Sequence, residues 1–126
     1  MLKNTYSEIT MGSIRLVYDS ESDILDVDFR LTGEKPNQGI EIHDNITVWT
    51  DAQGTRILHL MLLSYSTLLE QPALSLGKLK KLPARQRAGL LKLLTSDPVK
   101  RFLVCLDEKA LLFRVTEPGV REVAAA

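Results

Sequence analysis

Apolar and polar residues alternate one by one in several short stretches of the first half, and this pattern limits the fold more than any other feature. Residues 13–18 alternate in this way, and the alternation resumes over residues 24–31. A period of two is typical of β-strands, because successive side chains point to opposite faces of a sheet. Residues 19–23 between them are short and polar, which predicts a hairpin.

Three further strands follow at residues 39–43, 46–50 and 56–63. The turns between them contain Asp, Asn and Gly, which tolerate the positive φ that tight hairpins require. In the last strand, residues 57–63 are apolar on both faces apart from His59, so we expect this strand to be central in the sheet. Five strands with such connections predict an antiparallel meander.

The second half can cover one face of this sheet. Pro83 is suited to the first turn of a helix that runs to about Leu94, because its fixed φ is already helical. Residues 102–106 and 111–115 alternate again and predict a second hairpin, whereas residues 71–82 are either a short helix or a loop. We therefore expect an α+β fold in which a helix and a C-terminal β-hairpin pack on the meander.

The chain has 126 residues, which predicts one domain. We divide residues 1–126 into a tail at 1–12, the meander at 13–70 and the helix with hairpin at 71–126. No apolar run approaches the roughly 20 residues of a membrane helix, so no membrane partner is expected. Cys105 is the single cysteine, and a lone thiol fits a reducing compartment, so we expect a cytoplasmic protein.

Charge is divided unevenly along the chain. Residues 1–70 hold five Lys or Arg and eleven Asp or Glu, for a net charge of −6, and residues 71–126 carry +6. We interpret this as two halves that pack against each other. The alternative is a nucleic-acid partner for the basic segment 78–101, in which the candidate contact residues are Lys80, Lys81, Arg85 and Lys92.

Acidic residues crowd the first hairpin and suggest a cation site. The segment fails as a helix–loop–helix calcium loop, because its sixth and twelfth positions are Ile24 and Arg30 instead of glycine and glutamate. Alternation still places side chains of one strand on a common face, beside those of the next strand along the chain. The resulting acidic and histidine face consists of Asp26, Asp28, Glu41 and His43. We interpret it as a solvated strand face with no metal.

The sequence contains none of the common catalytic or cofactor-binding motifs that we searched for. We find no Gly-rich phosphate loop, no dinucleotide fingerprint and no serine elbow, so no cofactor is expected. Cys105 paired with a histidine remains an alternative nucleophile, but in an apolar strand we expect it to act as a small hydrophobe. His59 is expected to be partly buried with a hydrogen-bond partner.

Trp49 is the only tryptophan, and alternation places it opposite Ile46 and Val48. We expect it to pack under the second half of the chain. The alternative is an exposed anchor in an interface, a role in which tryptophan is enriched.

The turn and strand motifs of residues 17–63 also resemble a known family. The stretch begins with Tyr18-Asp19-x-Glu21-x-Asp23-x-Leu25-x-Val27 and continues with Gly39-Ile40-Glu41-Ile42, Ile46-Thr47-Val48 and Asp51-x-x-Gly54-x-x-Ile57. It is similar to the bacterial family called domain of unknown function 2283. The resemblance implies a β-rich fold and no activity, since the family is uncharacterised. Residues 72–126 extend beyond it.

These features favour a small non-enzymatic module that binds a protein partner or associates with itself, one form of which is the antitoxin-like partner of a small toxin. Sheet edges offer backbone groups for pairing with another chain. Two alternatives stay open. One is nucleic-acid binding through the basic segment, and the other is an enzyme with a dispersed site around His43 or Asp26.

Overall fold

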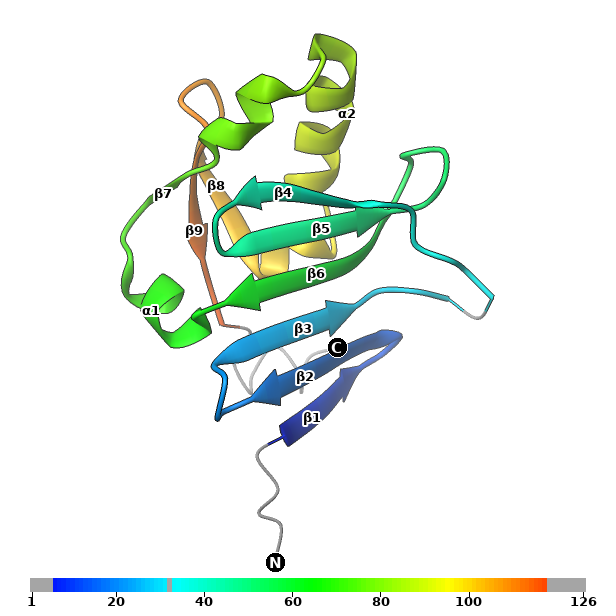
Figure 1. Cartoon of the computed structure of the whole chain (residues 1–126), viewed down its shortest axis with the longest axis vertical. Coiled ribbons are helices and arrows are strands. Elements are labelled where there is room, and N and C mark those ends of the chain that lie inside the picture. Colours follow the sequence, from blue (N-terminus) through cyan, green and yellow to red (C-terminus); the bar gives the residue numbers. More distant parts are fainter. Residues whose placement is uncertain (1–5, 32, 118–126) are drawn as a thin grey trace, which may run out of the picture.

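The computed structural model of the chain describes residues 6–31 and 33–117, and its main element is a six-stranded antiparallel sheet, here called sheet A (Figure 1). Its strands are β1 (Tyr6–Met11), β2 (Ile14–Asp19), β3 (Ile24–Asp28), β4 (Gly39–His43), β5 (Ile46–Thr50) and β6 (Ile57–Leu63). They lie in the order β1-β2-β3-β6-β5-β4.

A second layer follows in the chain and supplies the helices and a small three-stranded sheet B, of order β7-β9-β8. Its elements are α1 (Tyr65–Glu70), β7 (Leu74–Ser75), the 3₁₀-helix η1 (Gly77–Lys81), α2 (Ala84–Leu94), the 3₁₀-helix η2 (Val99–Arg101), β8 (Leu103–Asp107) and β9 (Leu112–Val115). The predicted α+β fold, with its helix from Pro83 to Leu94 and its C-terminal hairpin, is confirmed.

Two features of sheet A differ from the sequence-based expectation. Residues 6–11, expected to belong to a tail, form β1 and pair with β2 through the two-residue turn Gly12-Ser13. The strand order is also not sequential, because the connection between β3 and β4 carries the chain to the far edge and β6 returns between β3 and β5. The expectation that β6 is central is correct. Residues 1–5 of the expected tail lie outside the described residues.

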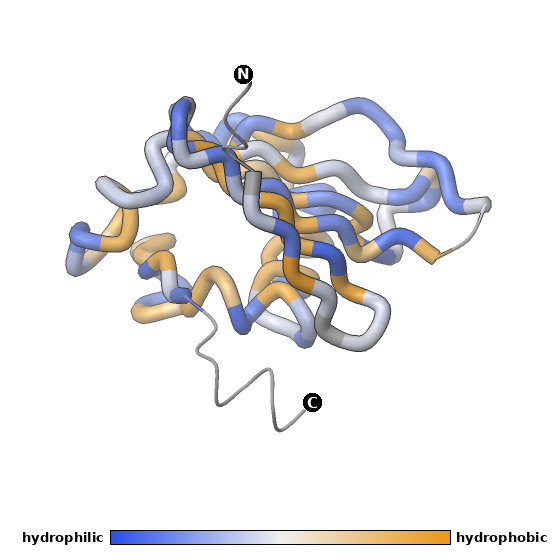
Figure 2. The backbone as a smooth tube through the Cα atoms, turned by 90° about the horizontal axis from the view of Figure 1, so that it is seen from below, coloured by the Kyte–Doolittle hydropathy of each residue, from blue (hydrophilic) through white to orange (hydrophobic). Residues whose placement is uncertain are grey.

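The hydrophobic core lies between sheet A and the second layer. Val27, Val48 and Leu60 point into it from neighbouring strands and are fully buried. The second layer contributes Phe102, whose ring meets that of Phe29 at a centroid distance of 5.9 Å. Figure 2 shows apolar and polar residues alternating along the strands, as a sheet with one covered face requires.

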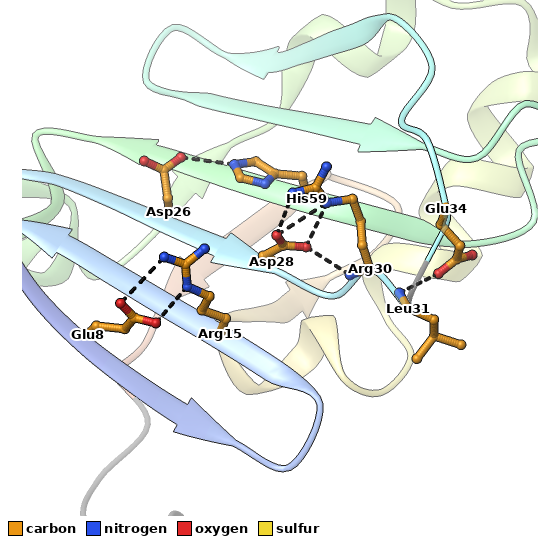
Figure 3. A network of polar contacts seen from close by, with 8 residues as sticks. All are labelled: Glu8, Arg15, Asp26, Asp28, Arg30, Leu31, Glu34 and His59. Carbon is orange, nitrogen blue, oxygen red and sulfur yellow. Dashed lines mark hydrogen bonds and ion pairs between the residues drawn. The ribbon is translucent and has the colours of Figure 1, made fainter.

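The opposite side of sheet A is not covered by any described helix or strand, and the second layer lies behind the sheet in Figure 3. Strand register places its side chains in rows across the sheet. We call this surface the open face and define it by Arg15, Val17, Asp26, Asp28, Thr47, Trp49, His59 and Met61. Apart from the exposed Arg15, these residues are half-buried by their neighbours.

Candidate functional site

A histidine and a carboxylate meet at the centre of the open face. The Nε2 atom of His59 in β6 lies 2.9 Å from Oδ1 of Asp26 in the neighbouring β3 (Figure 3). The side chain of His59 is 25% exposed and that of Asp26 is 41% exposed, so the pair is accessible to solvent from one side. The expected hydrogen-bond partner of His59 is thus Asp26. The sequence pattern did not reveal it, because the adjacency of β3 and β6 depends on the strand order.

Trp49 in β5 lies against the other side of His59. The two rings meet edge to face, with centroids 5.0 Å apart and an interplanar angle of 84°. The indole also extends over Gly39 in β4, where an added Cβ would lie 2.8 Å from Nε1 of Trp49. Trp49 therefore bridges β6 and β4 across the open face, and the expectation that it packs under the second half is wrong.

Ion pairs flank this cluster on β1, β2 and β3. Arg15 donates to Glu8 with a separation of 2.7 Å, and Arg30 donates to Asp28 at 2.8 Å (Figure 3). Hydrogen bonds from the Arg30 side chain hold the pKa of Asp28 below its usual range. Asp28 therefore remains ionised at neutral pH and is already partnered, which leaves Asp26 as the more available carboxylate.

The structure does not assemble the acidic and histidine face that the sequence suggested. Asp26 and Asp28 lie on β3, whereas Glu41 and His43 lie on β4, and both β6 and β5 separate these strands. With strands about 4.8 Å apart, the two groups are separated by roughly 14 Å. Glu41 instead pairs with Lys78 of η1, and Nδ1 of His43 accepts the backbone N–H of Asn45 at 3.0 Å.

The acidic turn at residues 19–23 is occupied by structural hydrogen bonds. Asp23 adopts a left-handed φ of 57° and accepts the hydroxyl of Tyr18 at 2.7 Å. Its carboxylate also accepts the backbone N–H of Ser66 at 3.0 Å, which ties the turn to the start of α1. These bonds from Ser66 and Tyr18 lower the pKa of Asp23. The family-like motif is thus a turn and helix anchor, and the described residues hold no group of three His, Cys, Asp or Glu suited to a metal ion.

A second family-like turn, Asp51-x-x-Gly54, has a similar structural role. The Asp51 carboxylate accepts the backbone N–H of Thr55 at 2.6 Å, and Gly54 adopts a φ of 70° that favours glycine. The adjacent Arg56 pairs with Glu34 and donates to the backbone carbonyl of Phe29 at 3.0 Å. These contacts hold the connection between β3 and β4 in place.

In the part of the chain that the structure describes, neither histidine is brought to the thiol of Cys105. Cys105 lies in β8 of sheet B, whereas His43 and His59 lie in sheet A. Burial raises the pKa of the Cys105 thiol, which lowers the thiolate fraction at neutral pH. Among the described residues, no hydroxyl or thiol forms a hydrogen bond with either histidine.

Only part of the basic segment has acidic partners, and besides Lys78 these cations are Lys100 and Arg101, which lie 3.6 Å and 3.7 Å from Asp97. Lys78 pairs with Glu41 and lies 2.9 Å from Asp44, so the predicted contact between the oppositely charged halves forms there. By contrast, four exposed cations have no Asp or Glu oxygen within 4 Å among residues 6–31 and 33–117, namely Lys80, Lys81, Arg85 and Lys92.

Comparison with known proteins gives no relative from which a function can be transferred. No family model, curated protein or solved structure matches the chain. The resemblance to domain of unknown function 2283 therefore rests on the turn and strand motifs alone. Within the described residues, no helix has the length and apolar character needed to cross a bilayer.

Proposed function

We propose that the protein is a small interaction module that binds another protein chain through the open face of sheet A. The observation that supports this most directly is the position of Trp49, which lies half-buried beside His59 on an uncovered sheet face. Tryptophan is enriched among the residues that contribute most to binding energy in interfaces. A sheet whose second face carries a tryptophan and further apolar side chains is suited to docking.

The chemistry of the open face indicates the kind of partner. Val17, Trp49 and Met61 supply apolar surface, and the free side of Asp26 supplies negative charge. A complementary protein surface would carry apolar side chains with a Lys or Arg directed at Asp26. Because the Trp49 ring is held between β4 and β6, it would lose little conformational freedom on binding.

The test is affinity purification of the tagged protein from its native host, with and without nuclease, followed by mass spectrometry. We expect one stoichiometric protein partner that survives nuclease and is lost from the variant Met61→Lys. The control variant Lys92→Ala changes an exposed residue of the second layer and should retain the partner. Thermal melts show whether Met61→Lys is folded. A protein recovered without any partner, or one equally retained by folded Met61→Lys, would contradict the proposal.

A second candidate function is nucleic-acid binding by the basic segment. It is favoured by the four cations without acidic partners, since lysine and arginine that neutralise phosphates release counterions. Gel shifts at two salt concentrations, with duplex and single strands, test it. We expect weaker binding and a shallower salt dependence after combined replacement of Lys80, Lys81 and Arg85 by alanine. Binding that is unchanged by these replacements would exclude this segment as the site.

A further inference from the structure

The two edges of sheet A differ in how they are protected. The edge strand β4 contacts η1, and Lys78 of η1 pairs with Glu41 and Asp44 at this edge. The edge strand β1 pairs with β2 on one side, and among the described residues no strand pairs with its other side (Figure 1). Open edges are sites at which another strand can add to a sheet.

The side chains of β1 suit an association with an apolar strand. Ile9 lies on the core side of the sheet opposite Leu16, yet it is 50% exposed. It borders a groove of about 320 Å³ between the end of sheet A and α1, with Tyr18, Tyr65 and Leu69 among its walls. A neighbouring strand that presented an apolar residue beside Ile9 would cover this surface.

From these features we infer that β1 pairs in antiparallel orientation with β1 of a second copy of the chain, with Ile9 opposite the second copy's Ile9. This surface is distinct from the open face, so the inference goes beyond the proposed function. In the two-residue β1–β2 hairpin the residues next to the turn exchange hydrogen bonds. By alternation, the backbone N–H and C=O groups of Glu8 and Thr10 then point to the free edge.

Charge favours this register over the one in which the two Glu8 residues face each other. The core-facing side chains of the two β1 strands lie on the same side of the joined sheet only if odd-numbered residues lie opposite odd-numbered residues. One such register places Glu8 opposite the second Glu8, where like charges repel. The inferred register places Glu8 opposite Thr10 of the other copy. In that copy Thr10 of β1 is paired with Arg15 of β2, so Glu8 and this Arg15 are two strands apart. This register avoids repulsion between the two Glu8 carboxylates, each of which already pairs with Arg15 of its own copy. The pairing closes at two copies because it occupies the free edge of each.

Sedimentation velocity over a wide range of protein concentrations tests the dimer. We expect the unmodified 126-residue chain to be dimeric and Ile9→Lys to be monomeric, because the variant places a charge at the symmetry axis. The matched control is Leu31→Lys, since Leu31 is similarly exposed, at 54%, but lies outside the sheet. It should remain dimeric, as should Met61→Lys on the open face, which separates this test from that of the proposed function.

Disulfide formation tests the register. In a Cys105→Ser background, single cysteines are introduced at residues 8, 9 and 10. Directly opposite residues without mutual hydrogen bonds have Cα atoms about 4.5 Å apart, within the range of about 4.4–6.8 Å for disulfides. We expect Ile9→Cys to form a covalent dimer faster than Glu8→Cys or Thr10→Cys. A monomer at every concentration, a dimer that is insensitive to Ile9→Lys, or faster linkage at residue 8 or 10 would overturn the inference.

Discussion

Replacement of Gly39 by alanine tests whether the open face is organised by Trp49. In the native structure the added Cβ would lie 2.8 Å from Nε1 and 2.9 Å from Cε2 of Trp49, and 3.2 Å from Cγ2 of Thr47. Carbon atoms in contact normally lie about 3.5–4.0 Å apart. The indole has little room to move away, because its edge-to-face contact with His59 holds the other side of the ring.

The expected loss of stability follows from two opposing effects. Inserting a methyl group into a well-packed site typically costs about 1–3 kcal/mol. Replacing glycine also reduces the freedom of the unfolded chain, which stabilises the folded state by about 0.4–1 kcal/mol where the backbone permits alanine. The net prediction for Gly39→Ala is therefore a decrease of roughly 1–2 kcal/mol in the free energy of unfolding.

Urea unfolding followed by fluorescence measures both the stability and the site. Trp49 is the only tryptophan, so a changed emission maximum of the native state reports displacement of this ring. The matched control is Gly89→Ala in α2, where an added Cβ meets no atom within 4 Å. Relief of the helix penalty of glycine should stabilise that variant by about 0.5–1 kcal/mol.

Two results would refute this reasoning. One is a Gly39→Ala protein as stable as the wild type with an unchanged emission spectrum, which would mean that Trp49 does not lie over β4. The other is destabilisation of equal size in Gly39→Ala and Gly89→Ala, which would indicate a general intolerance of substitution. Either result would contradict the conclusion that Trp49 organises the open face.

Three further predictions concern the stability of the core, the loss of stability at acidic pH and the reactivity of the Cys105 thiol. Leu60→Ala, at a fully buried position, should lower the free energy of unfolding by about 2–5 kcal/mol, whereas Leu106→Ala, at a position 51% exposed, should change it by less than about 0.5 kcal/mol in urea titrations. Arg30 lowers the folded-state pKa of Asp28, so its stabilisation is present above the ordinary carboxylate pKa and is lost as the pH falls through the lowered value. The free energy of unfolding, measured across acidic pH, should accordingly fall less steeply with decreasing pH in Asp28→Asn than in the wild type. The Cys105 thiol, with its raised pKa, should react with iodoacetamide at neutral pH more slowly in the native protein than in urea, and equal rates would contradict its burial.

Local chemistry was sufficient to predict most of the secondary structure. The alternating stretches became β2 to β6, and the helix was predicted from Pro83 and its apolar periodicity. The strand β1 was missed because an edge strand needs few apolar residues, and only the turn at Gly12 and its pairing with β2 reveal it. Residues 71–82, whose sequence fits either a short helix or a loop, contain β7 and η1, and such short elements depend on tertiary contacts.

The sequence by itself determined which side chains of each strand face the core and which face outward, because that choice follows from a period of two. It also determined the turns, where Asp and Gly satisfy the local backbone. Only the tertiary structure decided which strands are neighbours. Strand pairing depends on the packing of the whole sheet, and the insertion of β6 beside β3 brought His59, rather than His43, to Asp26. The same pairing placed Trp49 between His59 and Gly39 on an uncovered face.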